Sequence, residues 1–173
     1  ILKDTNTMLV HNPESNMVNA VGTSPVLKFM EKGLLVGLGT DGYTHDVIES
    51  YKVANCMQKL NALNPSVAWG EIPQMLFYNN REIANRYFKK PLGILKAGAA
   101  ADVIIADYLP RTPMTKDNIN SHILFGMNGR CVNTTVIAGK VVMKDRELVN
   151  IDEEAIYAKS RETANALWNR ING

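Results

Sequence analysis

The chain has 173 residues, 46% of them apolar, which is enough for one ordinary domain or two small ones with a sizeable core. Its formal net charge of +2, without any basic run, gives no argument for nucleic acid, and no apolar stretch is long enough for a membrane span. The two cysteines, Cys56 and Cys131, stand far apart. We therefore predict a cytoplasmic protein without a signal peptide, whose thiols are buried and reduced. A disulfide between the two cysteines is the alternative.

The first predicted element is a short strand over residues 7–10. It leads into the segment His11–Asn16, where Pro13 breaks regular structure and the asparagine and serine residues favour turns. We interpret this segment as a loop at the carboxyl end of the strand. His11 and Asn16 are its candidate substrate-binding residues, and the alternative is an ordinary turn held by local backbone bonds.

A second strand is predicted close to the first. Ser24 and Pro25 indicate the beginning of a helix over residues 25–32, which Gly33 ends. Residues 34–38 then form a largely apolar run without alternation, typical of a buried parallel strand. The order strand, helix, strand predicts a βα unit with a parallel neighbour and a right-handed crossover.

A carboxylate between glycines, Asp41, follows this second strand. The carboxyl edge of a parallel sheet is where α/β proteins place their chemistry, so His11 and Asp41 are expected at one edge on adjacent strands. Asp41 is therefore the first candidate for a catalytic or metal-binding residue, and His45, four residues later, is close enough to turn back toward it. Asp is also a good helix cap, so a purely structural role at the start of the next helix is the alternative.

The same stretch has the spacing of a dinucleotide-binding loop. Gly37, Gly39 and Gly42 fit the pattern G-x-G-x-x-G. In that interpretation Asp41 would lie inside the loop that receives a pyrophosphate, and two anions would be brought together. We therefore consider nucleotide binding a weaker hypothesis.

Helical periodicity follows at residues 47–60, 72–78 and 82–88, with Asn79 and Asn80 separating the last two segments. The character of the sequence changes near residue 90. Beyond it we predict a strand-rich unit with the following elements: a strand at 103–107, a helix at 118–127 that carries His122, a hairpin of 132–138 and 140–143 joined at Ala138-Gly139, a strand at 146–149, and a final helix from Asp152 to about Arg170.

We therefore divide the chain into residues 1–90, a piece of α/β sheet with its helices, and residues 91–173. Two parallel strands do not form a stable sheet alone, because their edges and faces need cover. The chain also begins with Ile1 instead of Met. Both observations lead us to expect a piece of a longer protein.

Four motifs follow one another along the chain. They are HNPESN at 11–16, GLGTDG at 37–42, GAAADVII at 98–105 and VIAGKVV at 136–142. In this order they resemble the C-terminal part of the amidohydrolase superfamily, in the branch of amino-heterocycle deaminases and chlorohydrolases. Tyr43–Asp46 is similar to the corresponding residues of aminohydrolases linked to selenium metabolism.

The resemblance implies a (β/α)₈ barrel with a β-sandwich built from both chain ends. Residues 7–10 would form the seventh barrel strand and residues 34–38 the eighth. Asp41 then matches the metal-binding Asp of the family, which also handles the proton of the attacking water. The other ligands of the family are histidines on earlier strands, among them a His-x-His pair. This sequence contains no His-x-His, so the resemblance places the remaining ligands in a missing N-terminal part.

The function that the resemblance implies is a metal-dependent hydrolase, with zinc favoured over iron, that removes an amino or similar group from a small nitrogen-containing ring. Asp41 would be the catalytic residue and metal ligand, while His11, His45 and Asn16 would contact substrate. We expect the chain alone to be inactive. Its expected partners are a small-molecule substrate and the N-terminal part of the same protein, and a homo-oligomer is a further alternative. The alternative is a non-catalytic association module in which Asp41 is only a helix cap.

Overall fold

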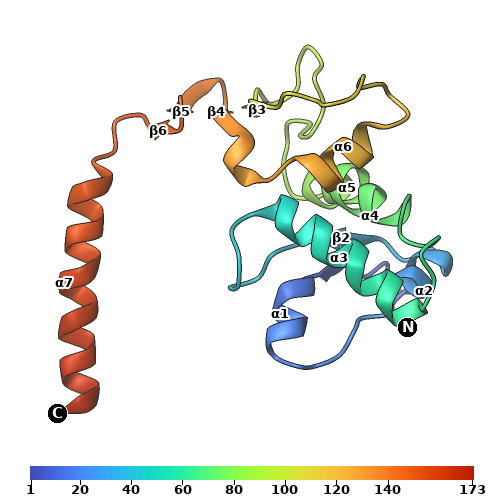
Figure 1. Cartoon of the computed structure of the whole chain (residues 1–173), viewed down its shortest axis with the longest axis horizontal. Helices are drawn as coiled ribbons and strands as arrows, with labels where there is room; N and C mark the ends of the chain where they lie inside the picture. Colours follow the sequence, from blue (N-terminus) through green and yellow to red (C-terminus); the bar gives the residue numbers. More distant parts are fainter.

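The computed structural model describes residues 1–173 and contains two small sheets (Figure 1). The first pairs β1 (Leu9–His11) with β2 (Val36–Leu38) in parallel. The second is antiparallel and has four strands in the order β3 (Val103–Ala106), β4 (Val132–Ile137), β5 (Lys140–Lys144) and β6 (Glu147–Leu148). The chain is therefore a mixed α/β structure.

The parallel pairing of the first two strands confirms the sequence prediction. His11 lies opposite Leu38, so the carboxyl ends of both strands meet at one edge, and the Gly39 N–H donates to the His11 carbonyl (2.9 Å). The observed β1 begins two residues later and ends one residue later than the predicted strand over residues 7–10. His11 is consequently its last residue and does not belong to a following loop.

The predicted loop over His11–Asn16 is wrong, because most of this segment belongs to helix α1 (Pro13–Val18). Pro13 occupies the first helical turn, where its missing N–H costs no hydrogen bond and its fixed φ suits the helix. Helix α2 (Val26–Glu31) follows, one residue later than predicted at its beginning.

The prediction that Asn79 and Asn80 separate two helices is also wrong. After α3 (Val47–Ala62), α4 (Glu71–Pro73), the π-helical η1 (Gln74–Asn79) and α5 (Asn80–Asn85) follow one another without interruption. The asparagine side chains bond to the edge of β2 that faces away from β1. Asn79 donates to the Val36 carbonyl (2.7 Å), and Asn80 both accepts from the Leu38 N–H and donates to its carbonyl (2.8 Å each).

The hydrophobic core lies where the helices cover one face of the β1–β2 sheet. Its buried members come from α2, β2, α3, α4, η1, α6 and the loop before α4: Val26, Val36, Leu38, Tyr51, Ala54, Ala68, Ile72, Met75 and Leu124. Leu9 packs against this core, whereas Val10, which points to the opposite face, is 54% exposed. On that opposite face α5 lies against Gly37 of β2, which is buried, so the sheet is exposed there only at β1.

The second half contains α6 (Ile119–Gly126), the short 3₁₀ helix η2 (Gly129–Cys131) and the predicted hairpin of β4 and β5. Ala138 and Gly139 both have positive φ (50° and 80°), as a tight two-residue hairpin requires. No residue of the four-stranded sheet is buried, and Ile104 and Ile105 are more than half exposed. The division of the chain near residue 90 stays a prediction.

Helix α7 (Glu153–Asn172) confirms the predicted C-terminal helix, and it extends away from the rest of the chain (Figure 1). Asp152 caps it by accepting a hydrogen bond from the Ala155 N–H (2.9 Å). None of its residues is buried. Its apolar side, which includes Ile156 and Leu167, has no partner within the chain.

Both cysteines are free thiols, as expected for the reduced state. The prediction that they are buried is wrong for Cys56, which lies on the solvent side of α3, and Cys131 is half-buried. None of the helices combines the length and the apolar character that crossing a membrane would need.

Candidate functional site

Asp41 lies in a tight turn directly after β2. Its backbone is left-handed (φ 55°), a conformation that Asp adopts more readily than most residues. One carboxylate oxygen, Oδ1, accepts from the Gly42 N–H (2.6 Å), and the other, Oδ2, accepts from the Ser15 hydroxyl (3.1 Å). The carboxylate is therefore exposed and held in a fixed orientation at the carboxyl end of the sheet.

The interpretation of Asp41 as a helix cap is wrong. Asp46 caps α3, because its Oδ1 accepts from the N–H groups of Ile48 (2.9 Å) and Glu49 (3.3 Å). The same bonds argue against nucleotide binding. The backbone donors that a pyrophosphate would need at this helix end already serve the Asp46 carboxylate.

Ser15 joins the two strand ends across the sheet edge. It belongs to α1, which follows β1, and its partner Asp41 follows β2. The strand order predicts that both segments lie at the same edge, but it does not pair these two side chains. Parallel pairing indicates that the segments are neighbours, whereas the Ser15–Asp41 contact also depends on the helical conformation of α1.

The two other exposed or half-buried candidates flank this pair. His45 lies four residues after Asp41 in the same loop, and its side chain is exposed. Asn16 is half-buried in α1, next to Ser15. Thr44 fixes the loop between Asp41 and Asp46, since its hydroxyl donates to a Glu49 carboxylate oxygen (2.7 Å) and accepts from the Asp46 N–H (3.1 Å).

His11 lies apart from these residues, on the helix-covered face of β1. Its side chain alternates with Val10 and is only 3% exposed, and neither ring nitrogen has a hydrogen-bond partner. Burial disfavours the charged ring and lowers the pKa of His11 to about 4. The ring is therefore neutral near pH 7.

Glu14 is a second buried residue near this edge, and no sequence pattern predicts its burial. Its Oε2 accepts from the Ser50 hydroxyl of α3 (2.9 Å), and its Oε1 has no partner. Burial is the main cause that raises the pKa of Glu14, and the carboxylates of Glu49 and Asp46 raise it further. Glu14 thus connects α1 to α3 beneath the Asp41 turn.

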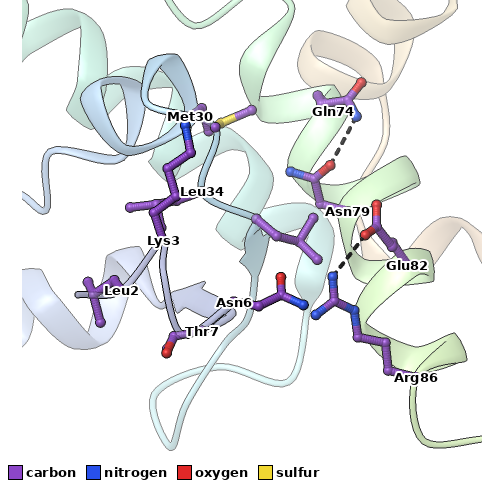
Figure 2. Close-up of a pocket in the computed structure, with 12 residues that line it drawn as sticks. Leu2, Lys3, Asn6, Thr7, Met30, Leu34, Gln74, Asn79, Glu82 and Arg86 are labelled. Atoms are coloured by element: carbon purple, nitrogen blue, oxygen red, sulfur yellow. Dashed lines mark hydrogen bonds and ion pairs between the residues drawn. The ribbon is translucent and has the colours of Figure 1, made fainter.

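A cavity of about 370 Å³ lies at the opposite end of the strands (Figure 2). Thr7 and Leu34, which precede β1 and β2, contribute to its wall. Figure 2 also shows the ion pair of Arg86 with Glu82 (3.1 Å) on the helix beside it. Neither Asp41 nor Ser15 lines it, so this cavity is distinct from the Asp41 site.

The 173 residues do not by themselves form a metal site. They contain no group of three or more histidine, cysteine, aspartate or glutamate side chains placed to hold an ion. Asp41 can offer one carboxylate oxygen, whereas a catalytic zinc commonly has three protein ligands. The donor set of this chain therefore fits a part of such a site and not the whole.

Comparison with known proteins gives this geometry a context. Residues 1–142 match the sequence model of the amidohydrolase family. The chain belongs to this family. The family assignment confirms the resemblance that the four motifs indicated, while the likeness of Tyr43–Asp46 to selenium-linked aminohydrolases stays a prediction.

Curated members of the family with similar sequences are deaminases. The chain is 32% identical over 177 residues to the 5'-deoxyadenosine deaminase of Methanosarcina mazei, covering 99% of this chain and 40% of that protein. It is 35% identical over 162 residues to the 5-methylthioadenosine/S-adenosylhomocysteine deaminase of Carboxydothermus hydrogenoformans, covering 90% and 36%. The chain thus spans about two fifths of the length of these relatives.

Solved structures of other amidohydrolase-type enzymes share the fold. An adenosine deaminase from Xanthomonas campestris with bound zinc superimposes with a TM-score of 0.77 and 22% identity, covering 92% of this chain and 37% of that one. The atrazine chlorohydrolase of Arthrobacter aurescens, complexed with zinc, gives 0.71 and 20%, covering 92% and 36%. Deaminases and chlorohydrolases are the two activities that the motif series indicated.

Proposed function

We propose that this chain is the C-terminal part of a metal-dependent hydrolase that removes an amino or similar group from a small nitrogen-containing ring. The observation that carries the proposal is the carboxylate of Asp41. It is exposed at the carboxyl end of β2, oriented by Ser15 and Gly42, and not used to cap a helix. The membership of the amidohydrolase family and the deaminase names of its relatives support this assignment.

In this proposal β1 and β2 are the last two strands of a (β/α)₈ barrel, and the four-stranded sheet is part of a β-sandwich. Two features support it. Val10 of β1 is exposed, although parallel sheets are normally covered on both faces. The apolar Ile104 and Ile105 are likewise exposed on the second sheet. The matched structures are about two and a half times as long as this chain, since the superposition covers 92% of it but only 37% and 36% of them, which leaves room for the remaining strands.

Asp41 would supply one ligand to a divalent metal, zinc more readily than iron, whose other ligands lie outside these 173 residues. The metal supplies a water of lowered pKa. Asp41 would take the proton of that water and return it to the leaving group, a role that its fixed orientation suits. Ser15 and the Gly42 N–H would keep the two carboxylate oxygens in place.

The proposed substrate contacts are His45 and Asn16, which lie on the two segments that follow the strands. Tyr43, Thr44 and His45 would shape the ring-binding space, and His45 would set specificity. A contact between His11 and the substrate would require its ring to leave the helix-covered face of β1, where it is buried.

The test is turnover by the full-length protein together with its metal content. We expect stoichiometric zinc or iron and ammonia release from one member of a panel containing 5'-deoxyadenosine, 5-methylthioadenosine and guanine. Asp41→Asn should lower kcat by at least about 100-fold, because the amide cannot take up the proton. Asp145→Asn is the matched control, since Asp145 is an exposed Asp that also has a left-handed backbone (φ 52°).

Two results would contradict the proposal. One is a full-length protein without bound metal and without any hydrolytic turnover. The other is an Asp41→Asn variant that is as active as Asp145→Asn. The 173-residue chain alone should bind no stoichiometric zinc and should be inactive, which the same two assays measure.

A further inference from the structure

The loop that carries Asp41 ends at a residue with an unusual number of partners. Besides capping α3 through Oδ1, Asp46 uses its second carboxylate oxygen, Oδ2, to accept a hydrogen bond from the Gly129 N–H (2.7 Å). Gly129 is 83 positions further along the chain, in the turn η2 that leads into β4. One side chain therefore bonds the beginning of α3 and the beginning of the hairpin of β4 and β5.

The contact between the two segments is close enough to require glycine at position 129. A Cβ added to Gly129 would lie 2.8 Å from Cγ and Oδ2 of Asp46 and 3.0 Å from its Oδ1. Real Cβ atoms do not approach other atoms so closely, so any larger residue would displace the carboxylate. The half-buried position of Asp46 leaves it little room to move.

Displacement of Asp46 would reach Asp41 through a short, fixed segment. The Thr44 hydroxyl accepts from the Asp46 N–H and donates to the Glu49 carboxylate. These two bonds hold the second half of the loop against the first turn of α3, so a shift of that turn would also shift the loop. The first half is held by Ser15 at Asp41 and by the strand pairing at Gly39. The Asp41 turn is thus anchored at both ends, and Asp46 is the anchor that depends on the second half of the chain.

We propose that Asp46 is a positioning residue, which transmits the placement of the turn at residues 128–131 to the catalytic turn at Asp41. This inference rests on the proposed function, and it assigns to the second half of the chain a part in orienting Asp41. The bond from Gly129 holds the Asp46 carboxylate. Asp46 holds the end of the loop, and the loop fixes the direction in which Asp41 faces.

The substitution Asp46→Asn separates this role from helix capping. Asn caps helices as well as Asp does, and its Oδ1 can still accept from the Ile48 and Glu49 N–H groups. Its Nδ2 would face the Gly129 N–H, and a donor cannot accept from a donor. Asp152→Asn is the matched control, because Asp152 uses its Oδ1 alone to cap α7, the helix that extends away from the rest of the chain (Figure 1).

The experiment compares these variants in the full-length protein loaded with zinc. We expect Asp46→Asn and Gly129→Ala each to lower kcat by about tenfold or more, since a small misplacement of a catalytic group has effects of this size. Both should also weaken zinc affinity and speed amide exchange of residues 42–45 by about tenfold. The double variant should lose little beyond either single one, because both substitutions break one contact.

The proposal is overturned if Asp46→Asn keeps the kcat, zinc affinity and loop exchange of the wild type, or if Asp152→Asn loses as much of each. It is also overturned if the activity of Asp46→Asn falls only as far as a lowered Tm explains. A wild-type protein without metal-dependent turnover would refute the proposed function instead. In that case the exchange of residues 42–45 would still decide whether Asp46 holds the loop.

Discussion

The buried ring of His11 predicts that this protein loses stability in acid. Burial lowers the pKa of His11 from 6.5 to about 4, so the folded chain resists protonation that the unfolded chain accepts. Between these two values the unfolded state binds more protons, and stability therefore falls as the pH falls. The stability that depends on the neutral His11 ring is fully present above pH 6.5 and is lost by about pH 4. Below pH 4 the ring is protonated in both the folded and the unfolded state.

The size of the loss follows from the width of this window. The free energy of unfolding falls by about 1.4 kcal/mol for each pH unit between 6.5 and 4. The loss is therefore about 3 kcal/mol over the whole window and about 2 kcal/mol by pH 5. Replacement by Leu removes the titrating group. It also removes two buried ring nitrogens without partners, each of which is expensive to desolvate. His11→Leu should therefore be at least as stable as the wild type at pH 7 and clearly more stable at pH 5.

Urea denaturation at pH steps from 7.5 to 4.5 measures this difference directly. We expect the free energy of unfolding of the wild type to fall relative to that of His11→Leu by about 2 kcal/mol between pH 7 and pH 5. His45→Leu is the control, because its ring is exposed and its removal leaves His11 in place. Parallel pH profiles of the wild type and His11→Leu would refute the reasoning, since His11 would then be solvated or paired.

Two further substitutions have expected effects on stability. Glu14→Gln keeps an acceptor for Ser50 and removes a carboxylate whose pKa is raised above its ordinary value of 4.5. The variant should therefore gain stability over the wild type as the pH rises to 8. Equal denaturation midpoints of the two proteins at pH 8 would contradict this expectation. Asn80→Ala leaves the Leu38 N–H and carbonyl without partners and should destabilise the 173-residue chain by about 1–3 kcal/mol. In the full-length protein the loss should be smaller if another barrel strand pairs with this edge of β2, and an equal loss in both would argue against a closed barrel.

Local patterns were sufficient where the interactions themselves are local. The hairpin follows from the turn residues Ala138 and Gly139, and α7 follows from the cap Asp152 and the acidic first turn. The parallel pairing of β1 and β2 follows from two apolar runs separated by a helix, because few topologies satisfy that order. The site residue Asp41 could be selected for the same reason, since the position after a buried parallel strand is defined by the strand.

Burial depended on packing that the sequence pattern does not contain. The segment from His11 to Asn16 is polar and contains a proline, a pattern that predicts a loop. Instead Pro13 begins α1, which packs on α3, and both His11 and Glu14 are buried. The contact that buries Glu14 joins it to Ser50, 36 positions away, and nothing within the segment indicates that partner.

The same limit applies to two aspartates that are five residues apart. Asp41 and Asp46 both precede a helix, and either could cap it by residue type alone. The difference lies in remote partners. The Gly129 N–H donates to the second carboxylate oxygen of Asp46, whereas the Ser15 hydroxyl orients the Asp41 carboxylate and leaves it exposed. A capping carboxylate has its oxygens occupied by backbone donors, and a catalytic one must keep an accessible oxygen. On that criterion Asp46 serves the architecture, whereas Asp41, although its Oδ1 accepts from the Gly42 N–H, is exposed as the proposed metal ligand requires.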